Sequence, residues 1–227
     1  MKPPIIVTGC PRSGSRIIAG ILDICGGNGG QSMDQKRFAS MRMQHLITEY
    51  MHWQDINDQY PLRPTIDLSV PVDWRNKVEA VAEKDGIQPG DTWFIRSPEA
   101  LLMWPVWHTA FPDAQWVIVR RKTGDIINSC KKTGHMTAYK DPNVRKAAGV
   151  KDEADGWKKW VHEYEARMVE TMMAGLDCKV IWPQRMAFGD FQQVHSLLQW
   201  TGLRWNSDVL GFVDKKLEKT RLKETEL

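Results

Sequence analysis

The chain has 227 residues, of which 42% are hydrophobic and 26% are charged, and this is enough for one globular domain with a sizeable core. Lysine and arginine number 31 against 28 aspartates and glutamates, so the net charge of +3 gives no indication of nucleic-acid binding. The apolar runs are too short to span a membrane, the start MKPPIIVTG lacks a signal-peptide core, and the four scattered cysteines contain no C-x-x-C pair. We therefore expect a cytoplasmic protein with no membrane, nucleic-acid or metal partner.

Short strand-like runs alternate with longer helix-like runs along the chain, and this pattern predicts an α/β fold. The strand-like runs are apolar without alternation, as in strands that are buried in a parallel sheet. Strands are predicted at residues 5–8, 93–96, 116–120 and 179–182. Helices are predicted at residues 15–25, 98–111, 123–132, 154–176 and 192–200, with Asn206 or Ser207 as the cap of a last helix.

Residues 26–91 have a different pattern. They contain one amphipathic helix and then the proline-rich stretch YPLRPTIDLSVPVD. The apolar residues that recur at helical spacing are Ala39, Met43, Leu46, Ile47 and Tyr50. We interpret this segment as a helical and loop insertion within a single domain of residues 1–227, in a place where acceptor-binding elements are common.

The segment TGCPRSGSR at residues 8–16 lies directly after the first strand and directly before the first helix. A glycine-containing turn in this place directs backbone N–H groups and a helix N-terminus at one point, which is typical of an anion-binding loop. When Gly9 and Gly14 are aligned on the Walker spacing, Ser15 stands where the nucleotide-binding lysine belongs, and Arg16 stands where the magnesium-binding hydroxyl belongs. The pattern therefore differs from that of a magnesium-dependent kinase at both positions that carry its chemistry.

The ends of the next two predicted strands are cationic. They carry Arg96 and the pair Arg120–Arg121, where a kinase would carry an aspartate for its metal ion. Asp125 and Ser129 follow in the helix after Arg121, and Ser129 can face back toward the strand end. A guanidinium and a hydroxyl so placed could share one phosphate, so the sequence predicts an anion site without a divalent ion.

The two motifs together resemble those of sulfotransferases of the P-loop superfamily that use 3′-phosphoadenosine 5′-phosphosulfate (PAPS). Pro11–Ser15 matches the family's PRSGT-like loop, and Arg121, Asp125 and Ser129 match its R-x-x-x-D-x-x-x-S stretch. FIRSPEALL and FPDAQWVIVR further resemble the bacterial branch of the family. The resemblance covers most of the chain outside the insertion and implies a three-layer P-loop fold with a central, mainly parallel sheet flanked by helices. It departs from the family at Ser15 and Arg16, where members usually have threonine, and the arginine is the unusual substitution.

The resemblance also implies a set of site residues. The residues that it implies for binding PAPS, or the product PAP, are Cys10, Pro11, Arg12, Ser13, Gly14, Ser15, Arg16, Arg121 and Ser129. Arg12 would place its charge near the bridging oxygen, and Arg96 would contact the transferred sulfonate. Arg121 and Ser129 would hold the 3′-phosphate, while Asp125 would brace the loop or cap its helix.

The general base is open among three residues. Asp34 lies in the region where tyrosyl-protein sulfotransferases carry a glutamate base, and Glu99 lies close to the place of the histidine of aryl sulfotransferases. We expect Asp34 before Glu99, with His45 on the insertion helix as a third option.

Three functions fit these observations. The first is metal-independent transfer of a sulfuryl group from PAPS to a hydroxyl or amine. A P-loop kinase that uses Mg·ATP is the second, and a nucleotide-binding module without catalysis is the third. The acceptor is expected to be a small molecule or a glycan, but the sequence does not give its class or the oligomeric state.

Overall fold

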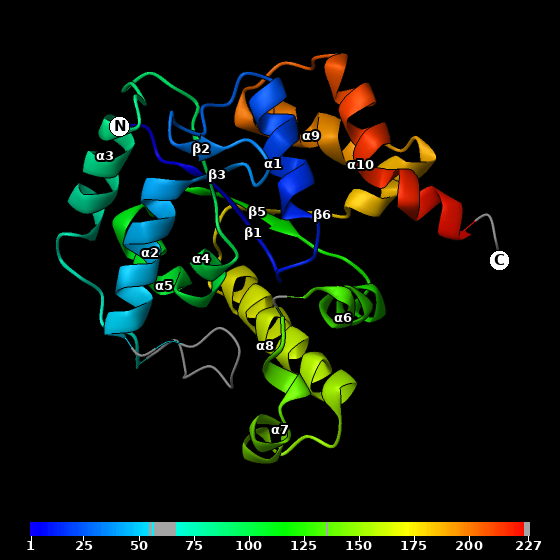
Figure 1. The fold of residues 1–227 in the computed structure, drawn as a ribbon. Helices are drawn as coiled ribbons and strands as arrows, with labels where there is room; N and C mark the ends of the chain where they lie inside the picture. Colours follow the sequence, from blue (N-terminus) through cyan, green and yellow to red (C-terminus); the bar gives the residue numbers. More distant parts are fainter. Residues whose placement is uncertain (55, 57–66, 135, 225–227) are drawn as a thin grey trace.

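Four parallel strands form the centre of the fold, in the order β4-β1-β5-β6 (Figure 1). The strands are β1 (Ile5–Thr8), β4 (Phe94–Arg96), β5 (Gln115–Val119) and β6 (Cys178–Ile181). The structure is a computed structural model that describes all residues except 55, 57–66, 135 and 225–227, so part of the proline-rich stretch lies outside the described residues. All four strands predicted from the sequence are confirmed to within one residue, and so is the parallel α/β fold.

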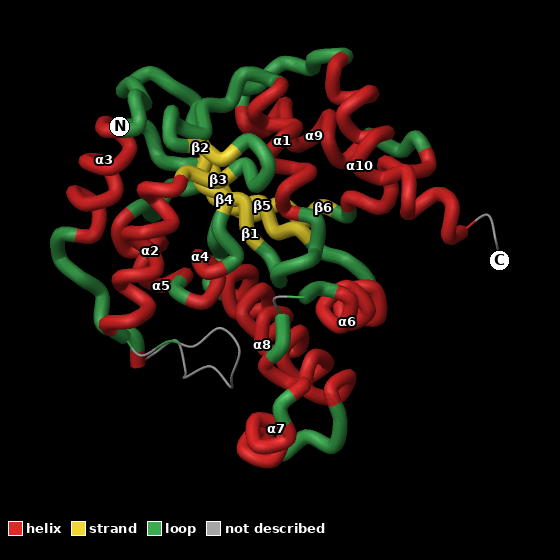
Figure 2. Tube along the Cα trace, viewed as in Figure 1, coloured by secondary structure: helices red, strands yellow, loops and turns green. Residues whose placement is uncertain are grey.

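Successive residues of each strand supply two separate cores. In β1, Ile5 and Val7 belong to one core and Ile6 belongs to the other. In β5, Val117 packs with Ile5, and Trp116 packs with Ile6. Because both faces of the sheet are covered by helices, the strands have no polar face, which is why their sequences show no alternation. Figure 2 shows the strands in the middle of the molecule with helices on both sides.

The helices are mostly those that the sequence predicts. They are α1 (Ser15–Ile24), α2 (Met41–Trp53), α3 (Trp74–Lys84), α4 (Glu99–Leu102), α5 (Trp104–Ala110), α6 (Thr123–Lys132), α7 (Pro142–Ala148), α8 (Glu153–Met173), α9 (Gln192–Thr201) and α10 (Asp208–Glu224), with the 3-10 turns η2 (Ala138–Lys140) and η3 (Pro183–Phe188). Helices α1, α9 and α10 cover one face of the sheet, and α2 to α5 with α8 cover the other (Figure 1). Within the described parts of the chain, no helix combines the length and the apolar character needed to cross a membrane.

The prediction of one continuous helix over residues 98–111 is wrong. The helix is interrupted at Met103, whose φ of −119° and ψ of 31° lie outside the helical range, and α4 and α5 form on either side of it. Pro105 explains the interruption, because it has no N–H to donate to the carbonyl of Leu101 one turn earlier and its ring would clash with that carbonyl. Pro105 therefore stands in the first turn of a new helix, where a proline is tolerated.

Residues 26–91 contain the predicted helix as α2, together with two elements that the sequence did not reveal. One is α3, and the other is a short antiparallel hairpin of β2 (Met33–Asp34) and β3 (Ala39–Ser40). Ser40 ends the hairpin and also caps α2, since its hydroxyl accepts the backbone N–H of Met43 at 3.0 Å. This part of the chain therefore leads from the end of α1 to β4 by way of the hairpin, α2 and α3.

Asn206 forms a cap at the start of α10, as the sequence predicts. Its side-chain oxygen accepts the N–H of Asp208 at 2.9 Å, and its amide donates to the carbonyl of Ile24 at 3.2 Å. We expect Asn206→Ala to lower the free energy of unfolding by about 1 kcal/mol in urea denaturation, because both contacts are lost. Ser207→Ala is the matched control, since that side chain is exposed, and it should change stability by less than about 0.5 kcal/mol. Equal effects of the two changes would contradict this account of the cap.

Candidate functional site

The predicted anion-binding loop joins β1 to α1 and has an unusual backbone. Gly9 and Gly14 have φ angles of 145° and 100°, and Arg12 has a φ of 74°, in the left-handed region that L-residues rarely adopt. A Cβ atom on Gly9 would lie 2.2 Å from the carbonyl oxygen of Val119 in β5. Glycine is therefore required at position 9, because no other residue leaves room for the loop to turn against the neighbouring strand.

The N-terminus of α1 is open toward this loop. Gly14 precedes the helix and offers no side-chain cap, and the first turn contains no acidic residue. The hydroxyl of Ser13 is buried and has no hydrogen-bond partner among the described residues. Because the first N–H groups of a helix lack acceptors within the helix, these donors are available to an anion held by the loop.

Two contacts connect the loop with the segment after β5. The guanidinium of Arg12 donates through Nε to the hydroxyl of Ser129 in α6, at 2.9 Å. Arg121 donates to the backbone carbonyl of Arg12 at 3.3 Å, and its Nε lies 3.6 Å from a carboxylate oxygen of Asp125. The structure thus brings Arg12 together with Arg121 and Ser129, both of which are more than 100 residues away from it in the sequence.

A third cation lies on the opposite side of the loop, at the end of β4. Arg96 donates through Nε to the hydroxyl of Ser15 at 3.2 Å and through a terminal nitrogen to the carbonyl of Arg37 at 3.3 Å. Burial lowers the pKa of Arg96 to about 10; nearby Glu99 opposes this shift, and Arg16 and Arg37 add to it. Arg96 therefore keeps its charge at neutral pH in a partly desolvated place, where its attraction for an anion is stronger than in water.

Other loop residues contribute in different ways. Burial lowers the pKa of Arg12, and the charges of Arg16 and Arg121 lower it further, so the exposed Arg16 lies near the same site. Cys10 is 1% exposed, and burial raises the pKa of its thiol well above the ordinary value, so the thiol stays neutral. Pro11 is half-buried in the loop. Cys10 can therefore contribute only through its backbone, whereas Arg16 can add charge.

The residues predicted as a general base lie in three different surroundings. Glu99 stands at the start of α4, close enough to Arg96 to affect its pKa, and accepts the hydroxyl of Ser97 at 2.6 Å. Asp34 lies in the hairpin, where its carboxylate accepts the backbone N–H groups of two residues in the turn, at 2.7 and 3.3 Å, and pairs with Arg37 at 3.5 Å. His45 lies on the exposed side of α2 and pairs with Glu49. Of the three, Glu99 is the one whose charge acts on Arg96.

Sequence reasoning missed Arg37, because nothing in its neighbourhood indicates that a turn carries it to the end of β4. It placed Arg120 and Arg121 together at the end of the strand, but expected an anion contact from Arg121 alone. In the structure, Arg120 is bound to Glu165 at 3.0 Å and lies over the ring of Trp182, so only Arg121 contacts the loop.

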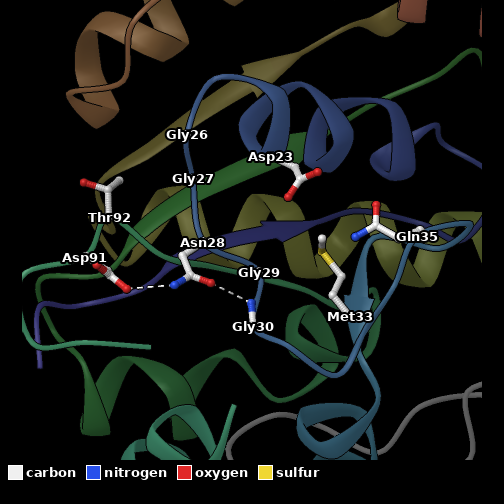
Figure 3. A pocket seen from close by; sticks show the side chains of 10 residues that line it. All are labelled: Asp23, Gly26, Gly27, Asn28, Gly29, Gly30, Met33, Gln35, Asp91 and Thr92. Atoms are coloured by element: carbon white, nitrogen blue, oxygen red, sulfur yellow. Dashed lines mark hydrogen bonds between the residues drawn. The ribbon is translucent and has the colours of Figure 1, made fainter. Parts of the chain in front are cut away.

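A hollow of about 430 Å³ lies elsewhere, along the glycine-rich segment after α1 (Figure 3). Its lining includes Asp23, Gly26–Gly30, Asp91 and Thr92, and Asn28 donates to Asp91 at 2.7 Å within it. None of the residues predicted for the anion site lines this hollow, and Thr92 precedes β4, at the edge of the sheet away from the loop. Among the residues that the structure describes, no three histidine, cysteine or acidic side chains gather in the way that a metal site requires.

The family of the chain follows from its sequence as a whole. The family model described as "Sulfotransferase family" matches residues 3–207. This chain belongs to the sulfotransferase family. No curated protein matches its sequence.

A solved sulfotransferase structure shares the fold. The sulfotransferase STF9 from Mycobacterium avium is similar with a TM-score of 0.58 and 10% identity, over 96% of this chain and 68% of that one. The sulfotransferase STF1 from Mycobacterium tuberculosis H37Rv gives a TM-score of 0.48 and 13% identity, over 94% of this chain and 71% of that one. At such low identity the likeness to STF9 supports the fold of this sulfotransferase and leaves its substrate open.

The close approach of Gly9 to β5 can be tested directly. We expect Gly9→Ala to lower the free energy of unfolding by about 1–3 kcal/mol, because the new methyl group overlaps the carbonyl of Val119. We also expect inorganic phosphate to raise the melting temperature of the wild type, and Gly9→Ala should abolish this rise. Gly124→Ala in α6 is the control, since its Cβ would meet nothing within 4 Å, and it should keep both properties. A Gly9→Ala protein with unchanged stability and phosphate response would contradict this description of the loop.

Proposed function

We propose that this sulfotransferase moves a sulfuryl group from PAPS to a hydroxyl or amine of a small-molecule or glycan acceptor, without a metal ion. The observation that carries the proposal is the contact of Arg12 with Ser129, supported by that of Arg121 with the loop. These contacts make one continuous anion site of the two segments that would hold the two charged ends of PAPS. The donor set of that site consists of guanidinium groups, hydroxyls and backbone N–H groups, which suits phosphate and sulfate oxygens.

The loop would hold the 5′-phosphosulfate. The N-terminus of α1 and the unpartnered hydroxyl of Ser13 supply donors without further rearrangement. Arg12 would provide the positive charge at the bridging oxygen. Arg16 would add to the positive electrostatic potential there from the solvent side. Such fixed donors stabilise the charge that builds up on the leaving phosphate as the bond to sulfur breaks.

Arg121 and Ser129 would hold the 3′-phosphate. Arg12 donates to the hydroxyl oxygen of Ser129, and this leaves the hydroxyl hydrogen free to donate to a phosphate. Asp125 lies beside Arg121 and would fix the direction of its guanidinium. This pair would give the enzyme its preference for PAPS over nucleotides that lack a 3′-phosphate.

Arg96 and Glu99 would act on the transferred group and on the acceptor. PAPS supplies an activated sulfuryl group, whose bond to the 5′-phosphate breaks as a new bond to the acceptor oxygen or nitrogen forms. Arg96 would stabilise the sulfonate oxygens during this in-line transfer. PAP is the leaving group, and the loop would hold its 5′-phosphate while the bond to sulfur breaks. The acceptor proton must pass to a base within about one hydrogen bond.

The geometry supports Glu99 ahead of Asp34 as that base. Glu99 lies near Arg96 and accepts one hydroxyl, whereas the carboxylate of Asp34 takes part in the turn of the hairpin and in a pair with Arg37. A carboxylate that holds a turn must give up those contacts to accept a proton. We therefore propose Glu99 as the general base and assign Asp34 a structural part in the hairpin.

Two alternatives remain to be separated from this proposal. A kinase would bind Mg·ATP, but Ser15 and Arg16 stand at the two decisive loop positions and make that chemistry a poor fit. A binding module would bind PAP without turning PAPS over. Thermal-shift titrations with PAP and Mg·ATP, followed by a screen of labelled PAPS against phenol, sugar, lipid and peptide acceptors, distinguish the three functions.

We expect PAP to raise the melting temperature without magnesium and at lower concentrations than AMP, because AMP lacks the 3′-phosphate. Arg121→Ala should weaken PAP binding by about tenfold or more and leave AMP binding almost unchanged, since one charge-assisted contact is lost. Arg120→Ala is the matched control, because that neighbouring guanidinium is held by Glu165. If both variants kept the preference for PAP over AMP, the assignment of the 3′-phosphate site would be wrong.

The base can be identified by two matched substitutions. Glu99→Gln should lower kcat for sulfuryl transfer by about 100-fold or more, while the affinity for PAP stays the same. Asp34→Asn should lower kcat by less than about fivefold, because it removes a contact within the turn and leaves the reacting groups in place. The measurement is the formation of labelled product with an acceptor found in the screen. A larger loss in Asp34→Asn than in Glu99→Gln would reverse the assignment.

A further inference from the structure

We propose that Asp85 is a positioning residue for sulfuryl transfer, which holds the β2–β3 hairpin so that the turn of the hairpin fixes Arg96 beside Ser15. The inference rests on the proposed function, because it assigns Arg96 to the sulfonate. Asp85 follows α3 and touches none of the loop residues, so any effect on the reaction must pass through the hairpin.

The hairpin cannot hold its place by itself. Each of its strands has two residues, which pair as Met33 with Ser40 and Asp34 with Ala39. An isolated pair of strands is marginally stable at best, even when it is longer than this one. The position of the turn between the strands therefore depends on what holds the two ends of the hairpin.

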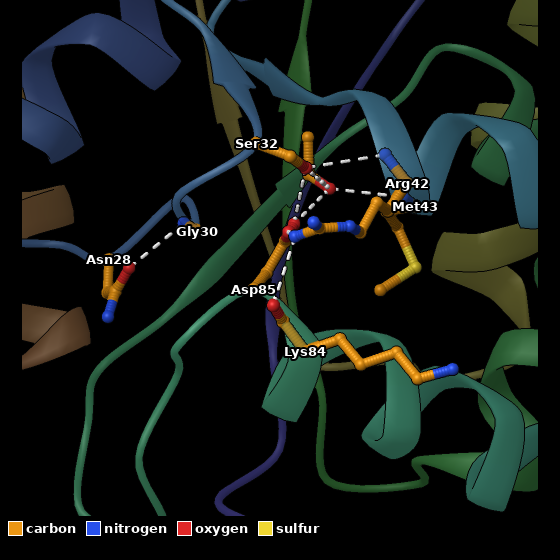
Figure 4. Close-up of polar contacts among 8 residues, drawn as sticks. Asn28, Gly30, Ser32, Arg42, Met43, Lys84 and Asp85 are labelled. Carbon is orange, nitrogen blue, oxygen red and sulfur yellow. Dashed lines mark hydrogen bonds and ion pairs between the residues drawn. The ribbon is translucent and has the colours of Figure 1, made fainter.

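Asp85 provides that support at the open end. Its carboxylate accepts the hydroxyls of Ser32 at 2.7 Å and Ser40 at 2.5 Å, one before β2 and one at the end of β3, and it pairs with Arg42 at 2.5 Å (Figure 4). The backbone takes part too, because Gln31 donates its N–H to the carbonyl of Asp85 at 2.8 Å. Both strands are thus bound to one side chain.

The carboxylate of Asp85 is held as an anion in a buried place. It is 1% exposed, whereas Arg42 reaches it from the solvent with half of its own side chain exposed. Burial by itself raises the pKa of Asp85, but the hydrogen bonds from Ser40, Ser32 and Arg42 outweigh it, so the pKa lies below the ordinary value. A buried anion with three donors is far more costly to disturb than a surface pair, because its partners would be left without an acceptor.

At the other end of the hairpin, the turn contacts the candidate active site. The carbonyl of Arg37 accepts a hydrogen bond from Arg96, whose Nε donates to Ser15 at the start of α1. The next residue, Phe38, has a φ of 52° and packs edge-on against Phe212 of α10, with 5.6 Å between the ring centroids. If the hairpin moved, Arg96 would lose the acceptor that aims its guanidinium at the place of the sulfonate.

The experiment compares the affinities of the protein for PAPS and PAP, which differ in the sulfonate that Arg96 would contact. In Asp85→Asn we expect PAPS affinity to fall by about fivefold to tenfold with PAP affinity within twofold of wild type, since a freed Arg96 affects only the sulfonate end. Ser32→Ala removes one of the three donors and should lower PAPS affinity by a smaller factor, again without changing PAP affinity. This variant provides the test if Asp85→Asn folds poorly.

Asp91→Asn is the matched control. Asp91 also accepts two hydrogen bonds, from Asn28 and from the backbone of Gln88, but it touches neither strand of the hairpin. It should lower stability and leave the ratio of PAPS to PAP affinity unchanged. Equal weakening of both ligands by Asp85→Asn, or no change in either, would overturn the positioning role. A wild-type protein that binds neither PAP nor PAPS would instead overturn the proposed function, and the inference with it.

Discussion

The hydrogen bond between Arg12 and Ser129 is the interaction on which the rest of the site depends. It joins the loop after β1 to the helix after β5, and these are neighbouring strands of the parallel sheet. Parallel strands end at the same edge, so each βα turn can contribute a cation or a hydroxyl to one shared space. The sheet order thus explains why a loop, a strand end and a helix from distant parts of the chain meet at the place proposed for the anion.

The cationic residues differ in how they are restrained. Arg121 is tied to the loop carbonyl and to Asp125, and Arg96 is tied to Ser15 and to the hairpin, whereas Arg16 stands in solvent. Restrained guanidinium groups lose less freedom when they bind an anion, so they are better suited to stabilise a transition state than a mobile one. In this chain the segment between α1 and β4 provides part of that restraint, because its hairpin accepts a hydrogen bond from Arg96.

Local chemistry decided how much could be predicted from the sequence. The strands and the loop between β1 and α1 were predictable because short apolar runs and the glycine turn have strong local preferences. The motif after β5 led us to expect Arg121 and Ser129 near this loop, and both contact Arg12, while their part in binding stays a prediction. The single helix over residues 98–111 was wrong because Pro105 prevents helical hydrogen bonding to the turn before it. The hairpin was missed because two-residue strands leave no periodic pattern in the sequence. Asp85 was missed because nothing in the sequence distinguishes a buried aspartate from an exposed one.

The left-handed backbone of Arg12 places opposing demands on one residue. Its φ of 74° would suit glycine, which reaches that region without steric cost, whereas the proposed chemistry requires a long cationic side chain. Folding stability and sulfuryl transfer therefore favour different amino acids here. Truncation of Arg12 to alanine keeps the backbone strain, while truncation to glycine removes it. The melting temperature of an Arg12 variant therefore does not measure what the guanidinium contributes to sulfuryl transfer.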